Sequence, residues 1–211
     1  MKDMKIIDLS KNEKPSDFEN AGLILITNIT ESNLKDAITA AESARISENV
    51  TAGILSGNIN PLNKNMKRLS DITDAVILSS GKIEDSSRKI IEAISDLVTK
   101  FGFVNIEIED LQEIFRDAGT VYFGAGTGKS AGAAALKASE MCGNMSAAKR
   151  VLMNITTGAE IMLSEISEAS RIIETNADSD AQIIWGHVIN ESIGANVRVS
   201  IFAAMNDKGR L

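Results

Sequence analysis

Three polar residues at the start of a predicted helix have a spacing that suits carboxylate chemistry. Asn105, Glu107 and Asp110 stand just before and within the first turn of a helix expected over residues 108–117. If Glu107 and Asp110 project toward a partner molecule, their carboxylates can polarise a water. The structural interpretation is that Asn105 is a good N-cap and that acids in a first turn favour the helix dipole by about 0.3–1 kcal/mol each. The local sequence leaves both interpretations open.

A glycine-rich segment at residues 124–130, Gly-Ala-Gly-Thr-Gly-Lys-Ser, comes close to a phosphate-binding motif. A P-loop requires G-x-x-x-x-G-K-[ST], which places its first glycine at position 123, and that position holds Phe123. We expect a strand at residues 120–123, a flexible connection with Lys129 in solvent, and a helix from residue 130. The remaining alternative is a shortened glycine loop that binds an anion at the helix N-terminus.

The sequence contains one cysteine and one histidine, Cys142 and His187. This count excludes a disulfide framework, a multi-cysteine zinc site and a histidine-rich metal site, so we expect no metal. Cys142 lies late in an alanine-rich helix and is predicted to be a small core residue. His187 follows Trp185 and Gly186 in an apolar strand, and we predict a half-buried strand residue rather than a catalyst.

Composition and charge narrow the classes of partner. The 211 residues carry a net charge of −7, and an acidic surface repels phosphate backbones, which makes sequence-independent nucleic-acid binding unfavourable. The charged N-terminus has no apolar leader segment, and the longest apolar run, near residues 22–27, is far shorter than a membrane span. We expect a cytoplasmic protein with no membrane insertion.

The hydrophobic pattern predicts an α/β protein with a change of organisation near its middle. Strands are expected at residues 4–9, 22–29, 50–59 and 75–79, and helices at 33–47, 62–71 and 85–101, which is typical of a parallel α/β layer. The apolar run at 22–29 fits a strand buried on both faces.

The second half reads as an α+β layer. We expect helices at residues 108–117, 130–142 and 163–176, strands at 120–123 and 150–157, and two strands at 181–188 and 196–205 that pair with each other to close the sheet. We therefore predict two domains, residues 1–102 and 103–211, packed together through the long helix 85–101.

Read in order, residues 75–205 resemble the FtsZ family, the prokaryotic relatives of tubulin. The resemblance is carried by residues 93–105, by residues 148–158 with the Leu-Ser-Glu that begins at Leu163, by residues 180–186 and by residues 197–204. It implies part of a Rossmann-like GTPase domain, a central helix at residues 85–101, and an activation domain with a four-stranded sheet.

The resemblance also gives the acidic motif a meaning. Asn105, Glu107 and Asp110 match the family's synergy loop, N-x-D-x-x-D, which inserts into the next subunit of a filament and completes its GTPase site. The first acid here is Glu107 instead of Asp, and its extra methylene displaces the carboxylate by about one C–C bond, a shift that matters in catalysis. The resemblance implies catalysis in trans by these residues.

The first half departs from the family where phosphates would bind. The family carries a glycine-rich loop after the strand that corresponds to residues 22–29, whereas residues 30–36 here contain no glycine and include Glu31 and Asp36. A backbone without glycine approaches phosphate poorly, and carboxylates repel it. Only 21 residues precede Gly22, so we also expect a shortened N-terminal half. At the central helix, Asp85 alone remains of the family's guanine-reading Asn-Asp pair, so it would contact guanine only if a nucleotide is bound.

These observations favour an FtsZ-like cell-division or cytoskeletal protein that has lost its GTP site, requires no cofactor and acts through contacts with itself or with a full-length FtsZ-type protein. Two alternatives stay open. One is a GTP-binding GTPase with rearranged phosphate loops that uses residues 124–130. The other is a binding protein outside the cytoskeleton that shares only the fold.

Overall fold

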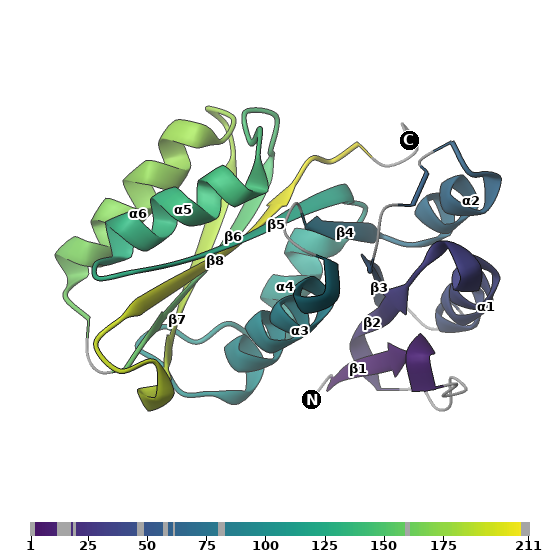
Figure 1. Cartoon of the computed structure of the whole chain (residues 1–211), viewed down its shortest axis with the longest axis horizontal. Coiled ribbons are helices and arrows are strands. Elements are labelled where there is room, and N and C mark those ends of the chain that lie inside the picture. The colour runs from purple at the N-terminus through teal and green to yellow at the C-terminus, as the bar shows by residue number, and fades with distance from the viewer. Residues whose placement is uncertain are drawn as a thin grey trace.

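The described residues form one continuous eight-stranded sheet in the order β1-β2-β3-β4-β5-β8-β6-β7 (Figure 1). The computed structural model describes residues 3–11, 18, 20–45, 49–56, 59–60, 62–79, 83–158 and 161–207, with the side chains of residues 83–86 left out. The predicted fold class, a parallel layer followed by a central helix and an α+β layer, is confirmed.

The N-terminal half is a parallel layer. It contains β1 (Asp3–Asp8), β2 (Ala21–Ile29), β3 (Val50–Leu55) and β4 (Ala75–Ser79), and β4 continues in parallel to β5 (Gly119–Gly128). Strand β2 is buried along almost its whole length, as its apolar run predicts. Leu23 and Leu25 face one side of the sheet, while Ile24 and Ile26 pack on the other with α1 (Leu34–Ala44) and α2 (Lys64–Ile72).

Two helices in the middle of the molecule pack against strands of both halves of the sheet. Helix α3 (Ile83–Thr99) and helix α4 (Ile108–Phe115) share one hydrophobic core with strands of the N-terminal half and with Leu152, Val188 and Phe202 of the C-terminal half. Figure 1 shows them between the α1–α2 pair and the α5–α6 pair. The predicted boundary at residues 102 and 103 falls in the α3–α4 loop, and the β4–β5 pairing carries the sheet across it.

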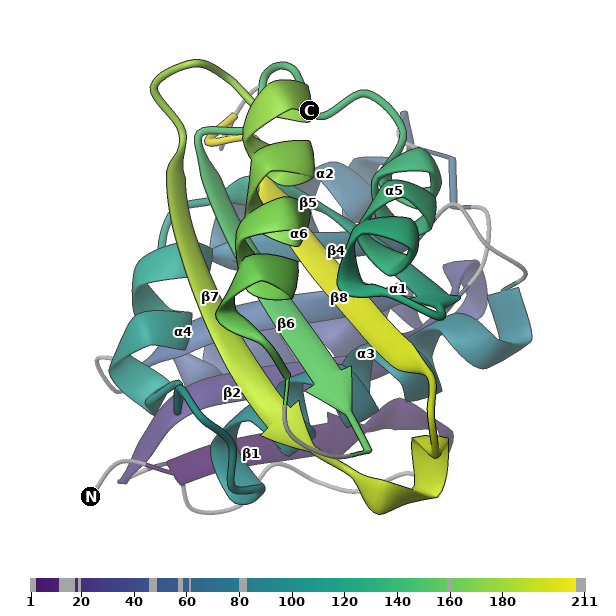
Figure 2. The ribbon, with the colours of Figure 1, turned by 90° about the vertical axis from the view of Figure 1, so that its left-hand side faces the viewer.

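The C-terminal half is a mixed sheet covered on its outer face by α5 (Ala131–Cys142) and α6 (Leu163–Asn176) (Figure 2). Strand β8 (Val197–Ala204) lies antiparallel between β5 and β6 (Arg150–Thr157), and β7 (Gln182–Ile189) pairs in parallel with β6 at the edge. The expectation that the last two strands pair with each other is therefore wrong. Helix α6 is a crossover that makes β6 and β7 parallel neighbours, and the almost fully buried β8 takes a central position.

The glycine-rich segment is neither a phosphate loop nor a flexible connection. Strand β5 continues through Gly128, eight residues pair with β8 from Val121 onward, and α5 begins at Ala131 with Ser130 as its N-cap. A Cβ on Gly126 would lie 2.2 Å from the Ala134 carbonyl oxygen, so the glycine permits close packing of α5 on β5. The glycines serve helix–strand packing, which local motif reading could not distinguish from a loop.

Candidate functional site

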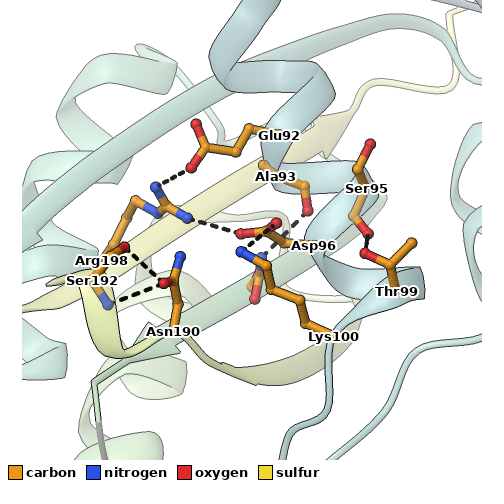
Figure 3. Close-up of polar contacts among 10 residues, drawn as sticks. Glu92, Ala93, Ser95, Asp96, Thr99, Lys100, Asn190, Ser192 and Arg198 are labelled. Carbon is orange, nitrogen blue, oxygen red and sulfur yellow. Dashed lines mark hydrogen bonds and ion pairs between the residues drawn. The ribbon is translucent and has the colours of Figure 1, made fainter.

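The end of the central helix is fixed to the C-terminal sheet by an ionic cluster (Figure 3). Asp96, whose side chain is 7% exposed, binds Lys100 at 2.9 Å and Arg198 of β8 at 3.2 Å. Arg198 also reaches Glu92 one turn earlier, with 2.9 Å between Nη1 and Oε1. Arg198 lies on the α3 side of the sheet, opposite the face that packs on α5 and α6. The cluster sets the position from which the following loop departs.

That loop, residues 100–107, is hydrogen-bonded to the edge strand β7. The Ile189 N–H donates to the Phe101 carbonyl at 3.0 Å, and the His187 N–H donates to the Val104 carbonyl at 2.9 Å. The approach is close, because a Cβ on Gly102 would lie 1.5 Å from the His187 carbonyl oxygen. Any larger residue at Gly102 would push the loop away from the strand.

The His187 side chain makes a second attachment. Its Nδ1 accepts a hydrogen bond from the Phe103 N–H at 3.0 Å, and its Nε2 lies 2.8 Å from Thr157 Oγ1. A backbone N–H can only donate, so Nδ1 carries no proton and the neutral ring donates from Nε2. The residue is 2% exposed, more buried than predicted, and this burial lowers the pKa of His187 below its ordinary 6.5. His187 therefore lies in strand β7, as predicted, and its ring also holds the loop through Phe103.

The structure places the three residues of the acidic motif in different surroundings. Asn105 is exposed and its Oδ1 accepts from the Gly102 N–H at 3.3 Å. Asp110 is half-buried and its Oδ2 accepts from the Glu107 N–H at 2.8 Å, which caps the start of α4. Glu107 itself is exposed and forms the N-cap of α4. Glu107 is the acid of the motif most available to a partner, while Asp110 positions it.

Large apolar side chains stand in solvent around the same loop. Phe101 is 87% exposed, Phe103 is 77% exposed, and Ile189, bonded to Phe101, is 41% exposed. Within the described residues, Phe101 and Phe103 are among the most exposed large hydrophobic side chains, and Ile189 on the edge strand β7 lies beside Phe101. Exposed aromatic residues in a small area are typical of protein interfaces. We name Phe101, Phe103, Glu107 and Ile189 the loop face.

A polar network occupies the carboxyl ends of the parallel strands, where α/β sheets usually bind ligands. Asn28 at the end of β2 donates to the Asp8 carboxylate at the end of β1 with 2.7 Å between Nδ2 and Oδ1. Ser56, after β3, bonds to Asn28 and to Ser87 of α3. Burial raises the pKa of Asp8, but hydrogen bonds from Asn28 and Ser10 outweigh it and hold the pKa below its ordinary 3.8. These side chains use one another as partners.

Hydrogen bonds within the turn that follows β2 also occupy its polar groups. The Thr30 N–H donates to Asn33 Oδ1 at 2.7 Å, and Asn33 Nδ2 donates to the Asn28 carbonyl at 2.9 Å. Glu31 on this turn and Asp36 in the first turn of α1 are exposed, and Glu31 accepts from Asn63 Nδ2 at 3.2 Å. The turn presents carboxylates at this edge of the sheet.

Other predicted features are less fully described. Asp85 lies in the first turn of α3, and its side chain is outside the described residues. Within the described part of the chain, no group of three or more His, Cys, Asp or Glu residues could hold a metal ion. No helix in that part of the chain is long and apolar enough to cross a bilayer.

Three residues important to this site were not identified from the sequence. The prediction places Phe101 at the end of the helix over residues 85–101 and Phe103 at the start of the second domain, although two phenylalanines around a glycine after a helix signal an exposed turn. His187 lacked any neighbour in sequence that would reveal its contact with Phe103, 84 residues away.

Comparison with known proteins agrees with the fold. Residues 108–206 match the C-terminal domain of the FtsZ family. Two structures of FtsZ from M. jannaschii, one an empty dimer and one a mutant, superpose on 88% of the chain with TM-scores of 0.72 and 0.73 at 19% identity. TubZ of Bacillus thuringiensis serovar israelensis, in GDP-form protofilaments, superposes on 87% of the chain with a TM-score of 0.58 at 8% identity. The predicted resemblance is confirmed.

The chain spans about two thirds of the length of these relatives. It covers 64% and 66% of the two FtsZ chains and 64% of the TubZ chain. The similarity therefore concerns the fold of the shared part.

Proposed function

We propose that this FtsZ-like protein of the tubulin superfamily is a cytoskeletal, cell-division-type protein that works through contacts between subunits and has no GTP site of its own. Its partner is a second copy or a full-length FtsZ-type protein, in the cytoplasm. The observation that supports the proposal is the turn after β2, which lies at the carboxyl edge of the parallel strands, where α/β folds usually bind ligands, and which carries exposed carboxylates there.

Phosphate binding at a strand-to-helix turn needs unengaged backbone N–H groups, glycine freedom and an absence of negative charge. In this turn the Thr30 N–H is bonded to the Asn33 side chain, and the Asn33 N–H is bonded to the Thr30 carbonyl at 3.3 Å. Glu31 and Asp36 add two exposed carboxylates. A triphosphate placed here would meet electrostatic repulsion and few donors.

The network behind the turn supports the same proposal. Asp8, Asn28, Ser56 and Ser87 connect β1, β2, β3 and α3 through side-chain hydrogen bonds. Such a network stabilises the carboxyl edge of the sheet without a ligand, since each polar side chain already has a partner. An entering nucleotide would have to break these bonds.

The loop face supports a role in association. Phe101 and Phe103 stand on a loop that Gly102, His187 and the α3 ionic cluster hold against the sheet, so burying them against a partner costs little loop entropy. Aromatic anchors on a preformed surface carry much of the binding energy in protein interfaces. The related structures named as an FtsZ dimer and as TubZ protofilaments accord with this mode of action.

The nucleotide part of the proposal is tested by titrating the purified chain with a fluorescent GTP analogue, with an active FtsZ-type GTPase as the positive control. We expect no saturable binding in the micromolar range. Saturable binding that unlabelled GTP displaces would refute the proposal. It would favour a GTPase with rearranged loops, in which Asp85 contacts the guanine.

The partner part is tested by co-sedimentation of the chain with an assembled FtsZ-type protein, using Leu136→Ser as a matched control. Leu136 is 51% exposed on α5, away from the loop face. We expect the wild type and the control to pellet with the filaments and a Phe101→Ser/Phe103→Ser variant to stay in the supernatant. Failure of the wild type to pellet and to self-associate would favour the alternative of a binding protein outside the cytoskeleton.

A further inference from the structure

His187 is the side chain on which the loop face depends most directly. It joins three segments that are distant in sequence: Phe103 on the loop, its own strand β7, and Thr157 at the end of β6. Both ring nitrogens are engaged, and the residue is 2% exposed. The arrangement accommodates only the neutral ring with its proton on Nε2, because Nδ1 must accept from Phe103.

We propose that His187 is a pH-sensitive positioning residue: protonation of its Nδ1 breaks the bond to Phe103 and favours release of residues 101–104, which are then held on β7 only by the backbone bonds from His187 to Val104 and from Ile189 to Phe101. A protonated Nδ1 would place two N–H donors against each other at the present 3.0 Å contact, with no acceptor between them. The release itself is a property of the isolated chain. Its consequence for association rests on the proposed function of the loop face.

The surroundings of the ring favour the neutral form. Burial lowers the pKa of His187, and among the described residues no charged side chain contributes to this shift. The segments around the ring carry Lys100, Glu107 and Glu191. Lys100 is paired with Asp96, and the two glutamates are exposed. In the part of the chain that the structure describes, no carboxylate contributes to the pKa of His187, so none there offsets the charge of a protonated ring.

The direction of the pH effect follows from linkage. In the released loop His187 is solvated and has a pKa near its ordinary 6.5, whereas in the attached loop its pKa is lower. The released state binds the proton more tightly, so acidification through the interval between the two values favours release. Within that interval the opening equilibrium rises by up to about tenfold for each pH unit.

Amide hydrogen exchange measured by NMR between about pH 8 and pH 5 tests this inference, with protection factors corrected for the intrinsic exchange rate. We expect the Phe103 amide to be protected at the upper pH and to lose protection on acidification. The Lys149 amide, bonded to the Ala204 carbonyl at 2.9 Å at the far end of the sheet, serves as the internal control and should stay protected. The imidazole signals need no assignment because the chain has one histidine.

The variant His187→Asn supplies the matched control. Its side-chain oxygen branches from Cγ as Nδ1 does, so it can accept from Phe103 but does not titrate in this range. We expect Phe103 protection in this variant to be independent of pH. Protection in the wild type that stays constant while the imidazole protonates would overturn the inference, as would equal acid loss in His187→Asn.

The wild-type titration decides alone if the variant does not fold. Loss of protection at Phe103 and Lys149 together would mean that the whole protein unfolds and would also overturn the inference. Because these measurements use the isolated chain, they remain informative if association at the loop face fails its own test.

Discussion

Arg198 of β8 and Asp96 of α3 form an ion pair beneath the central helix, with 3.2 Å between Nη2 and Oδ2. The Asp96 side chain is 7% exposed and receives a second cation, Lys100, from the next turn. This pair joins the last turn of α3 to a central strand of the C-terminal sheet. It links the helix shared by both halves to the loop that carries Phe101, Phe103 and Glu107.

Removing Arg198 should destabilise the fold. Breaking a buried ion pair typically costs 3–5 kcal/mol, and we expect about 2–3 kcal/mol for Arg198→Ala because Lys100 remains beside Asp96. Urea unfolding followed by circular dichroism measures the change. As a control, Arg68→Ala breaks an exposed pair with Glu42 and should change stability by about 1 kcal/mol or less. Equal losses in the two variants would contradict the account of the α3–β8 attachment.

Gly126→Ala adds only one methyl group, but it should lower the stability of the fold substantially. The new Cβ would meet the Ala134 carbonyl oxygen at 2.2 Å and the Ala138 nitrogen at 2.7 Å, both of which are backbone atoms that move only with α5. We expect a loss of about 3 kcal/mol or more in the free energy of unfolding. Lys129→Ala, three residues on and exposed, should remain within about 0.5 kcal/mol of the wild type.

The same Lys129→Ala variant bears on the nucleotide question. If residues 124–130 bound phosphate, the change would abolish phosphate release from GTP. We expect no phosphate release from the wild type or the variant, because the proposed function includes no GTP site and those glycines form part of β5. A specific loss of phosphate release in a stable Lys129→Ala protein would reinstate the GTPase alternative.

Cys142 should be unreactive in the folded protein. It is 3% exposed, its Sγ lies near the Tyr122 and Ile201 carbonyls, and burial raises the pKa of its thiol to about 12. At pH 8 the thiolate fraction is then about one in ten thousand. A thiol reagent should label the protein only in denaturant. Rapid stoichiometric labelling of the native protein would show that α5 does not pack on β5 and β8 as described.

Asp8 should make the protein less stable in acid. Hydrogen bonds from Asn28 and Ser10 hold its pKa below the ordinary 3.8, so the unfolded chain binds the proton first as pH falls. The contribution of Asp8 is present above pH 3.8 and disappears below it. Unfolding measured against pH should show a shallower acid slope for Asp8→Asn than for the wild type. An unchanged slope would mean that the Asp8–Asn28 bond contributes little.

Much of the architecture could be read from hydrophobic periodicity. The strand at 75–79, the strand at 150–157 and the helix at 163–176 have the bounds that their patterns predict. Each of these segments carries a clear run or stripe of apolar residues. The order of the strands was harder to predict. The position of β6 between β8 and β7 depends on crossover connections and not on local sequence.

The site was predictable only in part. Glu107 and Asp110 could be found from spacing and from family resemblance. Their different roles, Glu107 exposed and Asp110 capping the helix, depend on the hydrogen bond from the Glu107 N–H to Asp110, which the sequence does not show. The glycines of residues 124–128 were misread because a packing glycine and a loop glycine look alike in sequence. The attachment of the loop by His187 joins residues too far apart for any local rule.

Sedimentation of the nucleotide-free chain across a range of concentrations tests the central claim most directly. The account predicts oligomers, alone or with an FtsZ-type partner, that persist without GTP and weaken by about tenfold or more in Phe101→Ser/Phe103→Ser, while Leu136→Ser behaves as the wild type. A chain that stays monomeric with itself and with the partner, or that associates only when GTP is bound, would contradict it.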